Sequence, residues 1–461
     1  MFQKILIANR GEIALRIIRA CRELGIRTVA IYSQADAEAL HAQLADEAIC
    51  IGPSAAAESY LDMERILSAC IAAKADAIHP GFGFLSENSK FADMCRKCGI
   101  TFIGPSAEVI ERMGNKSEAR NTMIKAGIPV VPGTERPLTD AGKAKEAADQ
   151  IGYPVRKFAD EIGYPVMIKA ALGGGGKGMR LSQTAEDFLE NFKVAQLEAI
   201  RGFGDDSMYI EKYIEEPKHI EFQILADKFG NVIQLGERDC SIQRNHQKVI
   251  EESPSSVLDE RLRKEMGAVA VRAAKAAAYE NAGTIEFLLD KQKRYYFMEM
   301  NTRIQVEHPV TEMVSGVDLI KEQIYIAAGL PLDLTQEEIT LRGHALECRI
   351  NAEDPKKNFM PCPGKLGQIH LPGGFGVRVD TAIYGGCEIS PYYDSMAAKV
   401  IVHDRTRQGA IQKMRSALGE LVLEGITTNL DFQFQILDDE DFINGNFDTS
   451  FIEKKFQMEK E

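Results

Sequence analysis

Three oxygen-bearing side chains near residue 300 have the types and the spacing of metal ligands. The stretch GTIEFLLDKQKRYYFMEMN has the pattern of a β-hairpin with a charged turn, and Glu299 and Asn301 share one face of its second strand. If Glu286 lies on the neighbouring strand, the three side chains converge. Mg²⁺ is commonly held by one or two carboxylates together with phosphate oxygens and water. The hairpin therefore predicts a Mg²⁺ site beside a phosphorylated ligand, with a salt-bridged surface strand as the alternative.

Three lysines could neutralise the charge of that ligand. Lys116 lies in MGNKSEAR, Lys169 ends the apolar run PVMIKA, and Lys177 lies in the glycine-rich stretch ALGGGGKGMRL. Exposed N–H groups beside a lysine suit an anion. The P-loop pattern requires Ser or Thr after the lysine, whereas Gly178 follows here. Stacked glycines then indicate either close approach to a ligand or a flexible hairpin.

The first hundred residues alternate strand-like and helix-like segments. The strand-like runs are KILIA, RTVAIYS, AICIG, DAIHPG and ITFIGPS, and the helix-like run GEIALRIIRACRELG follows the first. This alternation predicts a doubly wound parallel sheet. The first turn is ANRGEIA rather than GxGxxG, so a dinucleotide cofactor is not supported.

The rest of the chain divides at a Pro/Gly cluster and again near Gly343. The cluster AGIPVVPGTERP is followed by a small α/β region, by the strands IEFQILAD and NVIQLGERDCSIQ, and by an Ala-rich helix within 261–283. After Gly343, short β runs with one helix near Gly409–Leu421 predict a mainly β unit. We expect an α/β and α+β protein with domains at 1–113, 114–342 and 343–461.

Charge, hydropathy and cysteine content indicate which partners and which location in the cell the protein has. The 461 residues carry a net charge of −13 with no dense Lys/Arg block, which disfavours nucleic acid. No run of 18 apolar residues predicts a membrane span, and no secretory signal is expected at the N-terminus. The odd count of nine cysteines favours a reducing cytoplasm, and the CxxC of Cys95 and Cys98 lacks a second ligand pair for zinc.

A local near-repeat precedes the Lys169 strand. DQIGYPVRKFA at Asp149–Ala159 and DEIGYPVMIKA at Asp160–Ala170 match at an offset of 11 residues. Only the second copy continues as a clean apolar strand, because the first places Arg156 and Lys157 at positions that should be buried. We interpret the first copy as an inserted extension, which loops tolerate at small entropic cost. A disruptive insertion that displaces Lys169 is the alternative.

Several long motifs, in order, resemble the biotin carboxylase family of ATP-grasp enzymes. They are IANRGEIA, HPGFGFLSEN, MGNK, PVMIKAALGGGGKGMR, EKYIEEPKHIEFQ, ERDCSIQRNHQKVIEE, FMEMNTRIQVEHPVTE and RINAEDP. The resemblance covers nearly the whole chain and implies a central ATP-grasp domain with a mobile lid over about 131–214. The family normally has a single copy of IGYPV, so the near-repeat is a departure from its pattern.

The resemblance implies how ATP and its metal are held. Lys116 and Lys169 would contact the phosphates, and His219 would lie near the ribose. Two Mg²⁺ (or Mn²⁺) ions would be bound by Glu286, Glu299 and Asn301. The remaining expected ATP contacts are the adenine-side residues Glu211, Lys212 and Ile214 and the lid glycines Gly174, Gly175 and Gly176.

It also implies a site for bicarbonate and biotin. Arg303, Gln305 and the backbone of Val306 would bind bicarbonate, since a guanidinium fork fits a planar oxyanion. Glu307 would act as the general base, Lys248 would hold carboxyphosphate, and Arg349 would stabilise the biotin enolate.

Partners and competing functions follow from the same motifs. No AMKM-type attachment motif is present, and SMAAK at Ser395–Lys399 has the pattern of a β segment, so we expect biotin on a separate carrier protein. A carboxyltransferase subunit, acetyl-CoA carboxylase as the complex and a homodimer are further expectations. Three alternatives stay open: a subunit serving pyruvate or another acyl-CoA, a different ATP-grasp ligase, and a nucleotide-binding subunit disabled by the near-repeat.

Overall fold

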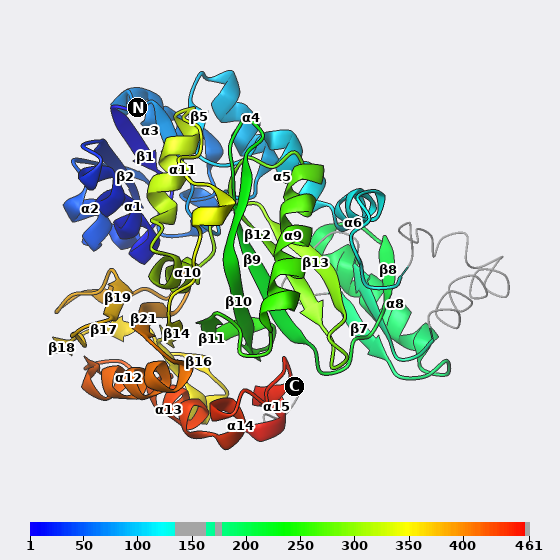
Figure 1. Ribbon diagram of the computed structural model, residues 1–461. Helices are drawn as coiled ribbons and strands as arrows, with labels where there is room; N and C mark the ends of the chain where they lie inside the picture. The colour runs from blue at the N-terminus through cyan, green and yellow to red at the C-terminus, as the bar shows by residue number, and fades with distance from the viewer. Residues whose placement is uncertain (134–162, 171–177, 457–461) are drawn as a thin grey trace.

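A computed structural model describes residues 1–133, 163–170 and 178–456 of the chain (Figure 1). The first copy of the near-repeat and the lid glycines Gly174, Gly175 and Gly176 lie outside these residues. The N-terminal sheet and the small sheet around β7 and β8 lie on opposite sides of a large central sheet. Among the described residues, no helix is long and apolar enough to cross a membrane.

The N-terminal unit is the expected parallel sheet, with strand order β3-β2-β1-β4-β5. Its central strand β1 buries Ile5, Leu6 and Ile7 completely, as a parallel sheet covered by helices requires. The strands are β1 Lys4–Ile7, β2 Arg27–Ser33, β3 Glu47–Gly52, β4 Ala77–His79 and β5 Thr101–Phe102. The helices are α1 Gly11–Glu23, α2 Leu40–Leu44, α3 Met63–Ala73, α4 Ser89–Lys97 and α5 Ala107–Gly114.

The large sheet has eight antiparallel strands in the order β13-β12-β9-β10-β11-β14-β21-β19. Its strands are β9 Lys218–Ala226, β10 Val232–Arg244, β11 Gln247–Ser253, β12 Asn281–Leu289, β13 Tyr295–Asn301, β14 His344–Asn351, β19 Val377–Thr381 and β21 Met396–Asp404. The strands of the second and third predicted domains thus join in one sheet through the pairing of β11 with β14. The predicted hairpin is β12–β13.

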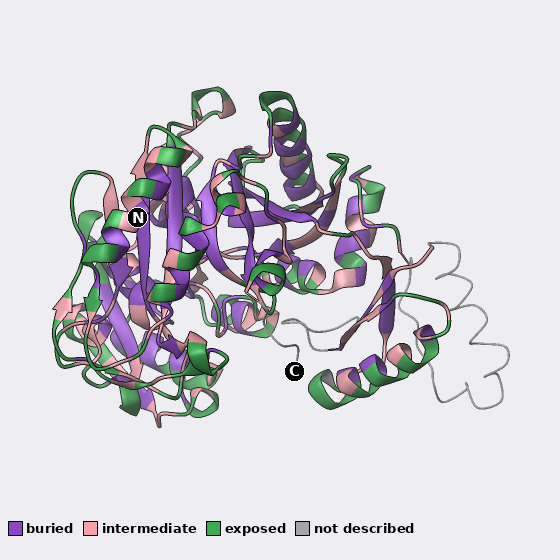
Figure 2. Cartoon of the chain, turned by 90° about the horizontal axis from the view of Figure 1, so that it is seen from below, coloured by how far each residue is buried: buried purple, intermediate pink, exposed green. Residues whose placement is uncertain are grey.

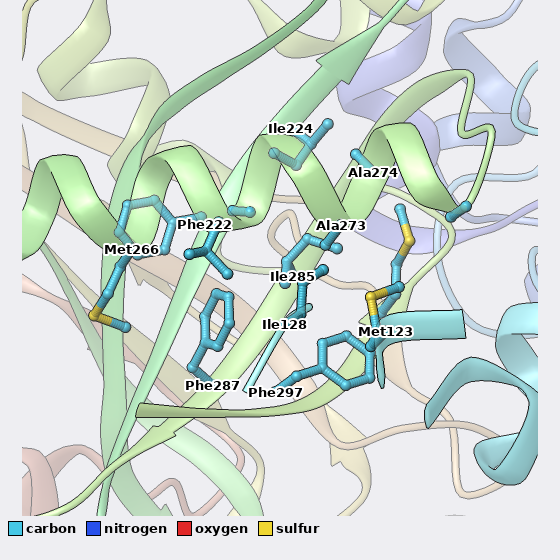
Figure 3. Close-up of a cluster of buried hydrophobic side chains, with 14 of the residues drawn as sticks. Met123, Ile128, Phe222, Ile224, Met266, Ala273, Ala274, Ile285, Phe287 and Phe297 are labelled. Carbon is cyan, nitrogen blue, oxygen red and sulfur yellow. The ribbon is translucent and has the colours of Figure 1, made fainter. Parts of the chain in front are cut away.

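Helix α9 (Glu260–Ala276) covers one face of this sheet (Figure 3). Met266, Ala273 and Ala274 face the aromatic side chains of Phe222 and Phe287, and all five are fully buried. Burying one such large apolar side chain contributes about 1.5–3 kcal/mol. The helix ends seven residues earlier than the predicted range, because the chain turns at Tyr279 into strand β12.

The lid region is a three-stranded sheet in the order β7-β6-β8, covered on one side by α8. Its elements are β6 Val166–Ala170, β7 Met179–Ser182, α8 Phe188–Phe203 and β8 Met208–Lys212. Figure 2 shows that α8 exposes its outer face. Strand β6 comes from the second copy of the near-repeat, as predicted, and its Ile168 is fully buried. Gly178 closes the loop with φ +70°, and a Cβ there would lie 3.0 Å from Ala170 Cβ.

Deletion of Asp149–Ala159 is expected to leave β6 in place and to preserve bicarbonate-dependent ADP release. The first copy cannot replace the second, since an 11-residue register shift would put Lys157 at the buried position of Ile168 and Phe158 in place of Lys169. The deletion variant and the intact chain are compared for turnover and for the KM for ATP. Loss of turnover in the deletion variant would show that the first copy is part of the working lid.

The remaining helices and short strands connect the sheets or pack against them. Four helices connect or cover the sheets: α6 Lys116–Lys125, α10 His308–Ser315, α11 Leu319–Ala327 and α12 Arg407–Glu420. Helix α12 is the one predicted near Gly409–Leu421, and α13 Leu430–Asp438, α14 Glu440–Ile443 and α15 Phe451–Lys455 were not predicted. The short strands are β15 Glu353–Asp354, β16 Met360–Pro361, β17 Gly364–Lys365, β18 Ile369–His370, β20 Glu388–Ile389 and β22 Val422–Leu423. The last four residues of SMAAK form the start of β21, as expected.

Candidate active site

One cavity of 880 Å³ brings the predicted site residues together. Its walls come from the N-terminal unit, the lid sheet, the hairpin β12–β13 and strand β14. Every predicted site residue that the structure describes lines it: Lys116, Lys169, Glu211, Lys212, Ile214, His219, Lys248, Glu286, Glu299, Asn301, Arg303, Gln305, Val306, Glu307 and Arg349. The three lid glycines lie outside the described residues.

Two lysines on different elements line the cavity. Lys116 is the first residue of α6, whose N-terminus is capped by Asn115 Oδ1 at 3.0 Å from Ser117 N. Burial lowers the pKa of Lys116, although Glu299 raises it. Lys169, near the end of β6, forms an ion pair with Glu211 on β8. Both ammonium groups are placed to meet an anion that enters between the lid and the central sheet.

The hairpin register explains the predicted metal site. Glu286 on β12 lies directly opposite Glu299 on β13, and Asn301 Nδ2 donates to Glu286 Oε1 at 2.7 Å. Burial and then the neighbouring Glu286 raise the pKa of Glu299. Burial opposes the charge of Glu286 as well, but Lys248 and His219 more than offset it and lower its pKa. Glu286 is buried and Glu299 is half-buried, and two carboxyl groups at adjacent positions fit a divalent cation.

His219 contacts a metal-ligand candidate in this structure. Its Nε2 lies 2.9 Å from Glu286 Oε2, and Gln243 Nε2 lies 2.7 Å from its Nδ1. Burial opposes protonation, but the Glu286 carboxylate outweighs it and raises the pKa of His219. Lys212, the other predicted ATP contact in this wall, donates to the carbonyl oxygens of Gly163 at 2.8 Å and Tyr164 at 3.1 Å.

Arg303 is held by a carboxylate that the sequence reasoning did not select. Its Nε donates to Glu87 Oε2 at 2.9 Å, and Nη1 donates to Gln305 Oε1 at 3.2 Å. Glu87 also accepts from the backbone N–H of Thr302 at 3.1 Å. The motif HPGFGFLSEN, which contains Glu87, was quoted for the resemblance, but nothing in its local pattern indicated a contact 216 residues away.

Glu307 lies at the centre of the cationic part of the cavity. It is fully buried directly before α10, where Lys248 Nζ donates to its Oε1 at 2.5 Å and Arg349 Nη2 donates to its Oε2 at 2.8 Å. Burial disfavours its charged form, but Lys248 and then Arg349 and Arg238 hold its pKa below the ordinary value. Glu307 is therefore an ionised carboxylate, which can accept a proton from a ligand bound against it.

Lys248 also belongs to a buried network of ion pairs. Glu221 on β9 accepts from Lys248 Nζ at 2.6 Å and from Arg238 Nε at 2.5 Å. Glu221 and Arg238 are both fully buried. Sequence reasoning missed this pair, although both residues lie in motifs quoted above, KHIEFQ and ERDCSIQ. The signal available was the run of polar residues His219, Glu221 and Gln223 at every second position of the buried strand β9.

Family models match the three parts of the chain. Residues 1–110 match "Biotin carboxylase, N-terminal domain" and 347–454 match "Biotin carboxylase C-terminal domain". The chain is also 56% identical to "Biotin carboxylase 1" of Bacillus subtilis, over 98% of each protein. The chain belongs to the biotin carboxylase family. The biotin carboxylase fold is therefore an α/β N-terminal sheet, an ATP-grasp centre and a C-terminal unit, as the sequence predicted.

Two solved structures similar to this biotin carboxylase bear on its chemistry. The crystal structure of the biotin carboxylase domain dimer of Hydrogenobacter thermophilus 2-oxoglutarate carboxylase, in complex with MgADP, ADP and bicarbonate, is 49% identical. It covers 100% of both chains with a TM-score of 0.93. The biotin carboxylase component of a pyruvate carboxylase is also 49% identical over 100% of both chains, with a TM-score of 0.84. The chain is an ATP-grasp enzyme that uses ATP and Mg²⁺.

The match to the central family model is divided at the near-repeat. The model "Carbamoyl-phosphate synthase L chain, ATP binding domain" matches residues 115–157 and then 155–335. The first segment ends within DQIGYPVRKFA, and the second runs through DEIGYPVMIKA and the rest of the domain. A break at this point supports the interpretation of the first copy as inserted sequence.

Proposed function

We propose that this biotin carboxylase carboxylates biotin with bicarbonate and ATP through carboxyphosphate, and that the predicted site residues carry the roles given above. The observation that supports it best is the position of Glu307. This buried carboxylate touches Lys248 and Arg349 and lies in one cavity with the Glu286–Glu299 pair. A base, an anion-binding pair and a metal-ligand pair are what phosphoryl transfer to bicarbonate needs.

In the first step Arg303 and Gln305 orient bicarbonate against Glu307, which takes its proton as a bicarbonate oxygen attacks the γ-phosphorus of ATP. The P–O bond to ADP breaks, and carboxyphosphate and ADP form. Lys116, Lys169 and Lys248 bind the negative charge of ATP and of the intermediate. Glu286, Glu299 and Asn301 would hold Mg²⁺, which would supply charge neutralisation on the phosphoryl groups.

In the second step carboxyphosphate breaks down to CO₂ and phosphate. The phosphate takes the proton from the ureido nitrogen of biotin, and that nitrogen attacks CO₂ to form carboxybiotin. Arg349 stabilises the enolate that biotin passes through, because its guanidinium places N–H donors beside Glu307 in the cavity. Exclusion of water from the cavity would protect carboxyphosphate from hydrolysis.

Biotin is proposed to arrive on a separate biotin carboxyl carrier protein. Lys399, the only lysine of SMAAK, is fully buried and donates to the carbonyl oxygen of Val306 at 2.7 Å, so it cannot present biotin to solvent. A carboxyltransferase subunit would complete the complex, which we propose to be acetyl-CoA carboxylase. The similar pyruvate carboxylase structure supports pyruvate as the second candidate acceptor.

Three organisational features belong to the same proposal. The domains are proposed at 1–113, 114–342 and 343–461, with the third continuing the central sheet of the second. A homodimer is proposed from the dimeric Hydrogenobacter thermophilus relative. All nine cysteines are described and unpaired, which supports a reducing cytoplasmic location.

The function is tested with purified chain, MgATP, free biotin and labelled bicarbonate. We expect acid-labile label on biotin and ADP release that requires bicarbonate. ADP release without label on biotin would instead indicate another ATP-grasp ligase. Bound ATP without either product would indicate a nucleotide-binding subunit without turnover.

A further inference from the structure

Arg349 is hydrogen-bonded to a second carboxylate, Glu251, which has no part in the reaction described above. Glu251 on β11 is fully buried, and its Oε1 accepts from Arg349 Nε at 2.6 Å. The Nη2 group of the same guanidinium donates to Glu307 Oε2 at 2.8 Å. One guanidinium therefore bridges two carboxylates, of which Glu307 lines the cavity and Glu251 does not.

A second buried carboxyl group lies directly opposite Glu251. Strands β11 and β14 pair Glu251 with Glu347, and both side chains are fully buried. Within the part of the chain that the structure describes, both oxygens of Glu347 and the Oε2 of Glu251 have no hydrogen-bond partner. Two such neighbouring carboxyl groups are not both ionised, because burial and mutual repulsion disfavour the second charge.

The surroundings decide which of the two carboxyl groups carries the charge. Glu251 accepts a hydrogen bond from Arg349, whereas Glu347 accepts none from any cation among the described residues. Burial raises the pKa of Glu347 well above its ordinary value, and burial raises the pKa of Glu251 to about 7 although Arg349 lowers it. The charged and titratable groups facing the pair are Lys248 on β11, Cys240 on β10, Arg349 and Cys348 on β14, Lys399 on β21 and Glu307 before α10.

We propose that Glu251 is a positioning residue that sets the basicity of Glu307 through their shared guanidinium. When Glu251 is ionised, Arg349 divides its hydrogen bonds between two carboxylates, and Glu307 is the stronger base. When Glu251 is protonated, Arg349 pairs with Glu307 alone, and Glu307 is the weaker base. Glu347 keeps its proton in both states. This inference rests on the proposed function of Glu307.

The test compares Glu251→Gln with the unchanged chain at pH 8 and at pH 6, in the biotin assay with saturating MgATP. At pH 8 Glu251 is ionised, so its replacement should lower kcat/KM for bicarbonate about tenfold, which corresponds to one pKa unit of base strength. At pH 6 Glu251 is already protonated, so the same replacement should change kcat/KM by less than about twofold. The KM for ATP should not change at either pH.

Glu347→Gln is the matched control, since it replaces the neighbouring buried carboxyl group, whose oxygens accept no hydrogen bond from Arg349. Its kcat/KM should match that of the unchanged chain at pH 8 and at pH 6. An equal loss at both pH values for Glu251→Gln, or no loss at pH 8, would overturn the proposal. If thermal melting shows that Glu251→Gln is not folded, the proposal is tested on the pH profile of the unchanged chain instead. Its kcat/KM for bicarbonate must then fall on acidification with a midpoint near pH 7, and a flat profile overturns the proposal.

This outcome is distinguishable from failure of the proposed function. A chain that places no label on biotin at any pH would contradict the function itself. A chain that labels biotin but shows the same Glu251→Gln effect at both pH values would contradict only the role of Glu251.

Discussion

Glu307→Gln abolishes bicarbonate-dependent ADP release and leaves ATP binding intact. The amide has nearly the shape of the carboxylate but cannot take a proton at neutral pH, so the base is lost while the cavity is kept. Glu307 is placed to act as that base because it is buried and held by Lys248 and Arg349. General bases typically contribute 10²- to 10⁴-fold, so we expect turnover to fall by at least about 100-fold.

Turnover is measured as bicarbonate-dependent ADP release, and ATP binding is measured separately by titration. Glu265→Gln is the matched control, because Glu265 lies on the exposed side of α9, does not line the cavity, and accepts a hydrogen bond from the hydroxyl of Tyr295 at 2.8 Å. The control should retain full turnover. Turnover of Glu307→Gln within a few-fold of the unchanged chain would remove Glu307 from the role of base.

Arg238→Met lowers the stability of the central sheet more than any surface change. Arg238 is fully buried and donates to Glu221, Gln223, Thr284 and Thr311. Its removal leaves the buried Glu221 with Lys248 as its remaining cation and leaves three further acceptors without their donor. Breaking a buried ion pair from one side costs about 3–5 kcal/mol. In a unit of this size that corresponds to roughly 6–20 °C in melting temperature.

The melting temperature is measured in parallel for Arg294→Met. Arg294 makes the same type of ion pair, with Asp290, but its side chain is 66% exposed in the turn between β12 and β13. Exposed pairs contribute about 0–1 kcal/mol, so this variant should melt within a few degrees of the unchanged chain. Equal melting temperatures for the two variants would show that the buried network is not a major source of stability.

The local part of the site was determined by the sequence itself. Alternation along GTIEFLL and FMEMN places Glu286, Glu299 and Asn301 on facing positions of a hairpin, because side chains alternate with a period of two along any strand. The same reasoning separates the two copies of the near-repeat, since only the second has an apolar residue, Ile168, at the inward position. Contacts within one hairpin or one strand need no information from distant residues.

The distant contacts were decided only by the tertiary structure. The sequence predicts short β runs after Gly343 but does not tell which strands they pair with. The pairing of β14 with β11 brings Arg349 to Glu251 and to Glu307. The contact between Arg303 and Glu87 likewise joins two units of the fold. Backbone hydrogen bonds between strands do not depend on the side chains. Which strand pairs with which, and in which register, is therefore set by the packing of the whole core. The environment that adjusts the pKa of Glu307 is therefore a property of the assembled sheet.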